Sequence, residues 1–169
     1  MATAKYQFED FLTSVNNDYK DFVITVHELF LQAGYKRKVE STKNHGLQLS
    51  YAEPKVKGVK GIVLIFLFRN DTLMARIYAE NHGKYPDVLS DLPEKIVSQI
   101  DKADDCKKMI DPTKCWTGCM GFDFHIRGKR YQKCYCNCFQ LKVEAESMAS
   151  LLALMQSEIN GRHTPSPSH

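Results

Sequence analysis

The stretch GIVLIFLFR, residues 61–69, decides the fold together with Asn70-Asp71 and TLMARIYAE, residues 72–80. The run from Ile62 to Phe68 is apolar without interruption, which is typical of a strand covered on both faces and central in its sheet. Asn and Asp tolerate the left-handed backbone of a two-residue hairpin turn, so Asn70-Asp71 predicts a tight connection to the next strand. We therefore expect an antiparallel sheet built around this hairpin.

The residues before this hairpin predict one helix and two more strands. Residues 17–33 place their apolar side chains at helical spacing, with Asn16, Asn17 or Asp18 as a possible cap and Gly34 as the stop. Residues 36–42 and 46–52 are expected to form a second hairpin, connected through the polar turn KNHG.

The C-terminal half predicts a middle helix over residues 93–110, a hairpin over 121–134 and a last helix over 146–159. The expected fold class is α+β, with an antiparallel sheet flanked by N-terminal, middle and C-terminal helices and with a Cys-rich β-hairpin. Residues 1–160 are expected to form a single domain that includes the Cys-rich segment 106–138. Residues 161–169 have no apolar pattern and are predicted to be a disordered tail.

Composition sets limits on the class of protein. The chain has 169 residues, a net charge of +3 and 43% hydrophobic residues, which is typical of one globular domain. The seven-residue apolar run at Ile62 is far shorter than a bilayer-spanning helix, and the first residues lack the apolar core of a signal peptide. These features favour a cytoplasmic protein without a membrane partner, in which cysteines stay reduced.

Five of the six cysteines fall between residues 115 and 138, a density that favours metal binding. A structural zinc ion (Zn²⁺) is the expected cofactor, because zinc is commonly held by four thiolates in a closed tetrahedral site. The predicted ligands are Cys106, Cys115, Cys119 and Cys134. Inert buried thiols are the main alternative.

A two-residue turn at Arg127-Gly128 would place His125 opposite Arg130 and Cys119 opposite Cys136. Because side chains alternate along a strand, one face of this hairpin would then be apolar. The other face would carry the sulfur atoms of Cys119, Cys134, Cys136 and Cys138. Cys136, Cys138 or His125 could replace one of the four proposed ligands.

The motifs CKKMIDPTKC, GFDF and GKRYQKC, preceded by IYAENHGKYPDVLSDLPEKI, resemble a family of uncharacterised small cytoplasmic bacterial proteins. The shared features are an LP helix start, a DP-x-KC step and a C-x8-C-x3-C-x14-C cysteine pattern. The resemblance implies that Cys106, Cys115, Cys119 and Cys134 are the common set. It implies no activity.

Three functions are open at this point. The first is a non-enzymatic zinc-binding module that contacts a macromolecule, either protein or nucleic acid. Nucleic acid would bind through the basic hairpin residues Arg127, Lys129, Arg130 and Lys133, although a solvated turn explains the same charges more simply.

The second function is an enzyme or small-ligand-binding protein with a site near His82 and Tyr85, with Asn81 and Lys84 beside them. The third is a thiol redox sensor that uses Cys136 or Cys138. Recognised catalytic motifs are not present in the sequence, which leaves no residue to assign as nucleophile or base. Their absence does not exclude an enzyme, and the sequence only leans toward a non-enzymatic role.

Overall fold

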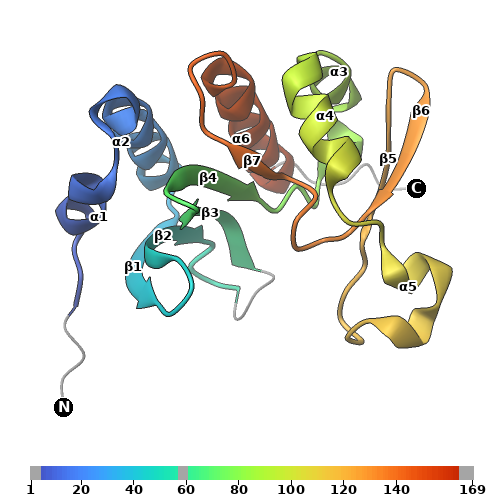
Figure 1. The fold of residues 1–169 in the computed structure, drawn as a ribbon, viewed down its shortest axis with the longest axis horizontal. Helices are drawn as coiled ribbons and strands as arrows, with labels where there is room; N and C mark the ends of the chain where they lie inside the picture. The colour runs from blue at the N-terminus through green and yellow to red at the C-terminus, as the bar shows by residue number, and fades with distance from the viewer. Residues whose placement is uncertain (1–4, 57–60, 164–169) are drawn as a thin grey trace.

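The computed structural model describes residues 5–56 and 61–163 and has the expected α+β fold (Figure 1). Within the described residues, the main sheet has five antiparallel strands in the order β1-β2-β3-β4-β7, and β5 pairs with β6 in a separate hairpin. The strands of the main sheet are β1 (Lys36–Thr42), β2 (Gly46–Ala52), β3 (Ile62–Arg69), β4 (Thr72–Ile77) and β7 (Gln140–Lys142); the hairpin consists of β5 (Phe122–Ile126) and β6 (Lys129–Lys133).

The central position predicted for the apolar run is confirmed. Residues 63–67 of β3 are all buried, and β3 pairs with β2 on one side and β4 on the other. Asn70 and Asp71 both adopt positive φ, at 48° and 60°, and close the turn between Arg69 and Thr72. The hairpin connection therefore has the local geometry that its two turn residues favour.

The helices are α1 (Phe8–Ser14), α2 (Asn17–Gln32), α3 (Pro86–Ser90), α4 (Glu94–Lys102), α5 (Lys107–Ile110) and α6 (Met148–His163), with short 3-10 turns η2 (His82–Lys84) and η3 (Pro112–Lys114). The rings of Phe11 in α1 and Phe22 in α2 both pack on Phe66 of β3. As predicted, Asn16 caps α2, because its side chain accepts a hydrogen bond from the Asp18 N–H at 3.0 Å. The long helices α2 and α6 lie side by side above the main sheet (Figure 1).

The prediction of one middle helix over residues 93–110 is wrong. The helix α4 ends at Lys102, and the chain then runs beside β6 before α5 begins. The Cys106 N–H donates to Gln132 O at 2.9 Å, and the Cys134 N–H donates to Asp104 O at 2.8 Å. The free edge of β6 offers these backbone partners, so pairing with it replaces helical hydrogen bonds that the sequence pattern alone would favour.

Several short elements were missed, among them α1, α3 and β7, and the predicted tail begins too early. The helix α1 and the three-residue strand β7 are too short to show a clear apolar period. The last helix continues to His163 because Arg162, inside the predicted tail, is buried among carboxylates. Residues 164–169 of that prediction lie outside the described residues.

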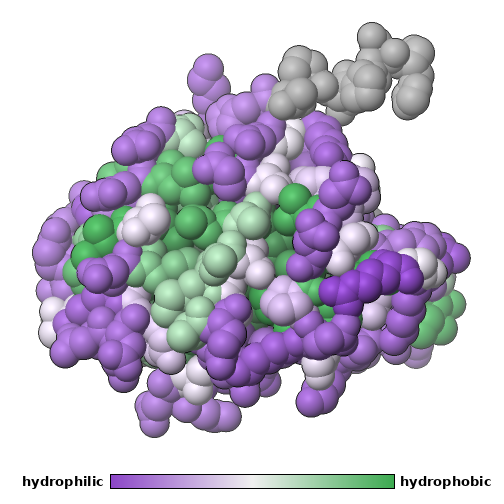
Figure 2. Space-filling model, turned by 90° about the horizontal axis from the view of Figure 1, so that it is seen from above, coloured by the Kyte–Doolittle hydropathy of each residue, from purple (hydrophilic) through white to green (hydrophobic). Residues whose placement is uncertain are grey.

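We call residues 104–139, which contain α5, η3, β5 and β6, the Cys-rich lobe. It forms one end of the molecule (Figure 1). Figure 2 shows that apolar surface interrupts the hydrophilic surface at this end, and the exposed large apolar residues of the lobe are Ile110, Trp116 and Met120.

Among the described residues, none of the helices has both the length and the apolar character needed to cross a bilayer.

Candidate metal and ligand site

The hairpin register agrees with the sequence prediction. His125 lies opposite Arg130, Phe122 lies opposite Lys133, and the turn residues Arg127 and Gly128 have φ of 49° and 84°. One face is buried and apolar as expected, and it carries Phe122, Phe124, Ile126 and Tyr131. The hairpin is therefore anchored on the core by one face.

The prediction that Cys119, Cys134, Cys136 and Cys138 share the opposite face is wrong. Strand β6 ends at Lys133, and residues 135–139 form a turn in which the Cys138 N–H donates to Cys134 O at 3.0 Å. Cys136 and Cys138 would share one face of a continuous strand, but in this turn they do not. Cys138 is buried at 1% exposure, and Cys136 is exposed. Burial strongly raises the pKa of the Cys138 thiol, which keeps it protonated and apolar in behaviour.

Two of the four predicted ligands lie on the paired segments of the lobe. Asp105 forms a β-bridge with Lys133. Because side chains alternate, Cys106 and Cys134 are diagonal neighbours on the face opposite to this bridge. The edge pairing therefore brings together two cysteines that are 28 positions apart.

The other two predicted ligands lie in the loop between η3 and β5. The Cys115 thiol and the Gly121 N–H both lie near enough to the Cys119 sulfur to influence its pKa. The Cys106 sulfur lies directly over Gly121, where an added Cβ would collide with it. Burial, followed by the neighbouring Cys115 and Cys106, raises the pKa of the Cys119 thiol despite the Gly121 N–H.

A lysine holds this loop against α5. The Lys108 ammonium donates to Thr117 O at 2.7 Å and to Cys119 O at 2.6 Å. Cys134 and Cys115 both lie near enough to Cys136 to influence the pKa of its thiol. Within residues 5–56 and 61–163, no group of three or more His, Cys, Asp or Glu side chains is arranged to hold a metal ion. The four cysteines are thus neighbours in a chain of pairwise contacts, and the zinc site stays a prediction.

The basic hairpin residues are engaged within the molecule. Arg127 donates to Ser90 O, Leu92 O and Glu94, and Lys129 pairs with Asp101 at 2.7 Å. These contacts fix the hairpin tip to α4 and the turn before it.

The remaining two hairpin cations are similarly occupied. Arg130 pairs with Asp123 at 2.6 Å and lowers the pKa of that carboxyl to about 2. Lys133 is buried and donates to Asp101 O, Ala103 O and Asp105, which leaves it inaccessible to a phosphate. The contacts account for all four charges without a nucleic acid.

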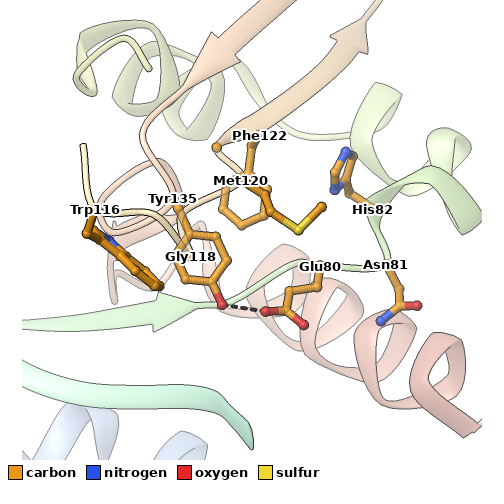
Figure 3. Close-up of a pocket in the computed structure, with 9 residues that line it drawn as sticks. Glu80, Asn81, His82, Trp116, Gly118, Met120, Phe122 and Tyr135 are labelled. Atoms are coloured by element: carbon orange, nitrogen blue, oxygen red, sulfur yellow. Dashed lines mark hydrogen bonds between the residues drawn. The ribbon is translucent and has the colours of Figure 1, made fainter. Parts of the chain in front are cut away.

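A cavity of about 390 Å³ lies between the loop after β4 and the Cys-rich lobe (Figure 3). Of the residues predicted to form a pocket, Asn81 and His82 line it. Tyr85 does not, because it is buried and its hydroxyl donates to Glu158 at 2.6 Å. Lys84 donates to Gly161 O at 2.6 Å. The complete lining is Glu80, Asn81, His82, Trp116, Gly118, Met120, Gly121, Phe122 and Tyr135.

A buried ion cluster lies behind the cavity. The Arg162 guanidinium pairs with Glu53 at 2.6 Å, with Glu158 at 2.8 Å and with Glu80 at 3.4 Å. Glu158 is fully buried and also accepts from the Asn81 N–H at 3.1 Å. We call these four residues the Arg162 cluster; it fixes the loop that carries Glu80 and Asn81. No sequence pattern indicated this cluster, because its members are far apart along the chain.

His82 has an orienting role in this arrangement. Its Nδ1 lies 2.8 Å from Ala79 O and its Nε2 lies 3.2 Å from Asp123 O, so both ring nitrogens face backbone carbonyls. The ring also packs edge-on against Phe122. His82 therefore connects the loop after β4 to β5, and neither nitrogen faces the cavity as a general base.

Comparison with protein-family models, with curated proteins and with solved structures returns no match. The family resemblance of the cysteine motifs stays a prediction.

Proposed function

We propose that this chain is a non-enzymatic zinc-binding protein whose metal site shapes a wall of a ligand-binding cavity. The observation that carries the proposal is the position of the loop between Cys115 and Cys119. Its intervening residues Trp116 and Gly118 line the cavity. A metal held by both cysteines would therefore fix the conformation of this wall.

The donor chemistry supports zinc. Four thiolates from Cys106, Cys115, Cys119 and Cys134 would form a closed site with no open position for a substrate. The Gly121 N–H lies near the Cys119 sulfur, where it could donate an outer hydrogen bond of the kind that orients metal ligands. Zinc binding in peptides contributes on the order of 10 kcal/mol, enough to order a loop-rich lobe.

A macromolecular partner bound through the basic hairpin is less well supported, because each of the four predicted cations already has intramolecular partners. A redox role for Cys136 is also less well supported. Burial, followed by Cys134, raises the pKa of the Cys136 thiol, which reduces the reactive thiolate form. The cavity beside His82 favours a ligand-binding role over both.

The first test is native mass spectrometry with elemental analysis on protein purified without added metal. We expect one zinc per chain. Replacing Cys106, Cys115, Cys119 or Cys134 by Ser should each abolish stoichiometric zinc, because each removes one of four bonds to the metal.

The matched control is Cys136→Ser, which changes an exposed cysteine of the same lobe and should retain the metal. A chain that is metal-free and resists unfolding equally with and without a chelator would contradict the proposal.

A further inference from the structure

We infer that the cavity binds an organic ammonium cation with apolar substituents, such as a trimethylammonium group. The inference rests on the proposed function only in taking the loop 115–119 as an ordered wall. It adds the chemical class of the ligand, and three features of the cavity point to that class.

The first feature is the density of aromatic rings. Trp116, Phe122 and Tyr135 line the cavity, and the Phe122 and Tyr135 rings lie 5.2 Å apart. Figure 3 shows Tyr135 between the Trp116 indole and Phe122, with Met120 beside them. Aromatic faces attract cations through the ring quadrupole, most strongly for tryptophan. Alkylated ammonium groups also lose less hydration than a bare ammonium when they enter an apolar site.

The second feature is the charge of the lining. Among the described residues that line the cavity, Glu80 is the one acidic side chain, and no lysine or arginine joins it. The Tyr135 hydroxyl donates to Glu80 (Figure 3), and this contact, together with burial, strongly raises the pKa of the tyrosine. The hydrogen bond therefore fixes the Glu80 carboxyl group in place, adjacent to an aromatic face.

The third feature is that Arg162 contacts Glu80 less closely than its other two carboxyl partners, which leaves Glu80 available to a ligand. Arg162 lies closer to Glu53 and Glu158, at 2.6 Å and 2.8 Å, than to Glu80, at 3.4 Å. One guanidinium thus serves three carboxyl groups, and Glu80 is the most distant of them. A cation in the cavity would pair with Glu80 at short range.

The loop 115–119, which forms one wall of the cavity, leaves the Trp116 indole exposed. Trp116 is 49% exposed, and its ring lies against Gly118, where an added Cβ would overlap the indole. Trp116 is also the only tryptophan of the chain, so its fluorescence reports on this cavity alone.

The test titrates the zinc-loaded full chain with choline and, separately, with 3,3-dimethylbutan-1-ol, which has the same shape without the charge. We expect choline to change the Trp116 fluorescence saturably and the neutral analogue to bind at least about tenfold more weakly. A second titration uses a trimethyllysine amide in place of choline. Binding by choline alone identifies a free small molecule as the ligand source, and preference for the amide identifies a modified protein side chain.

Three variants locate the site, with calorimetry replacing fluorescence where the indole is lost. Glu80→Gln and Trp116→Ala should each weaken choline binding about tenfold, since each removes one attractive group. Glu28→Gln, which removes an exposed carboxylate from α2, should leave binding unchanged.

Equal affinity for choline and its neutral analogue, or choline binding that Trp116→Ala does not alter, would overturn the inference. The metal content of the same samples is measured in parallel. Stoichiometric zinc without choline binding removes this inference and leaves the zinc site standing, whereas choline binding in a metal-free chain supports the ligand class and removes the zinc site.

Discussion

At the scale of single residues, the Arg162 cluster shows how one side chain fixes a distant loop. Arg162 is 6% exposed and reaches Glu53 before β3, Glu80 after β4 and Glu158 one turn earlier in α6. Its Nη2 also donates to Tyr78 O at 3.2 Å. The guanidinium can do this because its donors form a rigid planar fork, which a lysine ammonium does not provide.

We expect Arg162→Met to lower the free energy of unfolding by about 3–5 kcal/mol, because it leaves the fully buried Glu158 without its cation. Urea denaturation followed by circular dichroism measures the effect. Lys38→Met, which removes the exposed pair of Lys38 and Glu40, should cost at most about 1 kcal/mol. Equal losses in the two variants would contradict this account of the cluster.

At the scale of elements, the edge of β6 decides the course of the chain after α4. Backbone pairing of residues 104–106 with 132–134 ends the helical run and places Cys106 beside Gly121. Gly121 has φ of 65°, a conformation that glycine adopts without steric cost. The absence of a side chain there also makes room for the Cys106 sulfur. The glycine therefore allows both the backbone turn and the position of Cys106.

Gly121→Ala and Gly34→Ala form a matched pair. Both positions have positive φ, so each substitution should cost roughly 1–2 kcal/mol of stability from backbone strain. Only Gly121 has a neighbour in the way, since an added Cβ at Gly34 meets nothing within 4 Å. We therefore expect Gly121→Ala, and not Gly34→Ala, to weaken zinc binding as well. Competition with a chromogenic chelator measures zinc affinity, and equal affinities in both variants would show that Cys106 is no ligand.

At the scale of the whole molecule, the chain combines two regions that are stabilised differently. The five-stranded sheet with α1, α2 and α6 has a continuous apolar core, including fully buried Phe30, Leu64 and Phe66. The Cys-rich lobe has one buried apolar face and is otherwise made of short turns and thiols. With the proposed zinc ion bound, the lobe would depend more strongly on the metal than the sheet does.

Removal of zinc by a chelator should increase amide hydrogen exchange in the lobe by at least about tenfold, while the amides of β2 and β3 should keep their protection. Hydrogen exchange read by mass spectrometry, with and without chelator, measures both regions in one experiment. Unchanged exchange in the lobe of a chain that has lost stoichiometric zinc would show that the metal has no structural role.

The sequence by itself determined the features that depend on local pattern. The uninterrupted run at Ile62, the turn pairs Asn70-Asp71 and Arg127-Gly128, and the capped helix after Asn16 each combine a period with a specific turn residue. The density of cysteines between residues 115 and 138 is also a local feature, and the metal chemistry that it indicates stays a prediction.

Only the tertiary structure decided the remaining features, because they depend on contacts between segments far apart in the chain. These are the edge pairing that ends α4, the turn that buries Cys138, the carboxylates around Arg162, and the cavity between Glu80 and Trp116. Neither periodicity nor composition encodes which distant backbone edge or charge will be available, since that is set by how the elements pack.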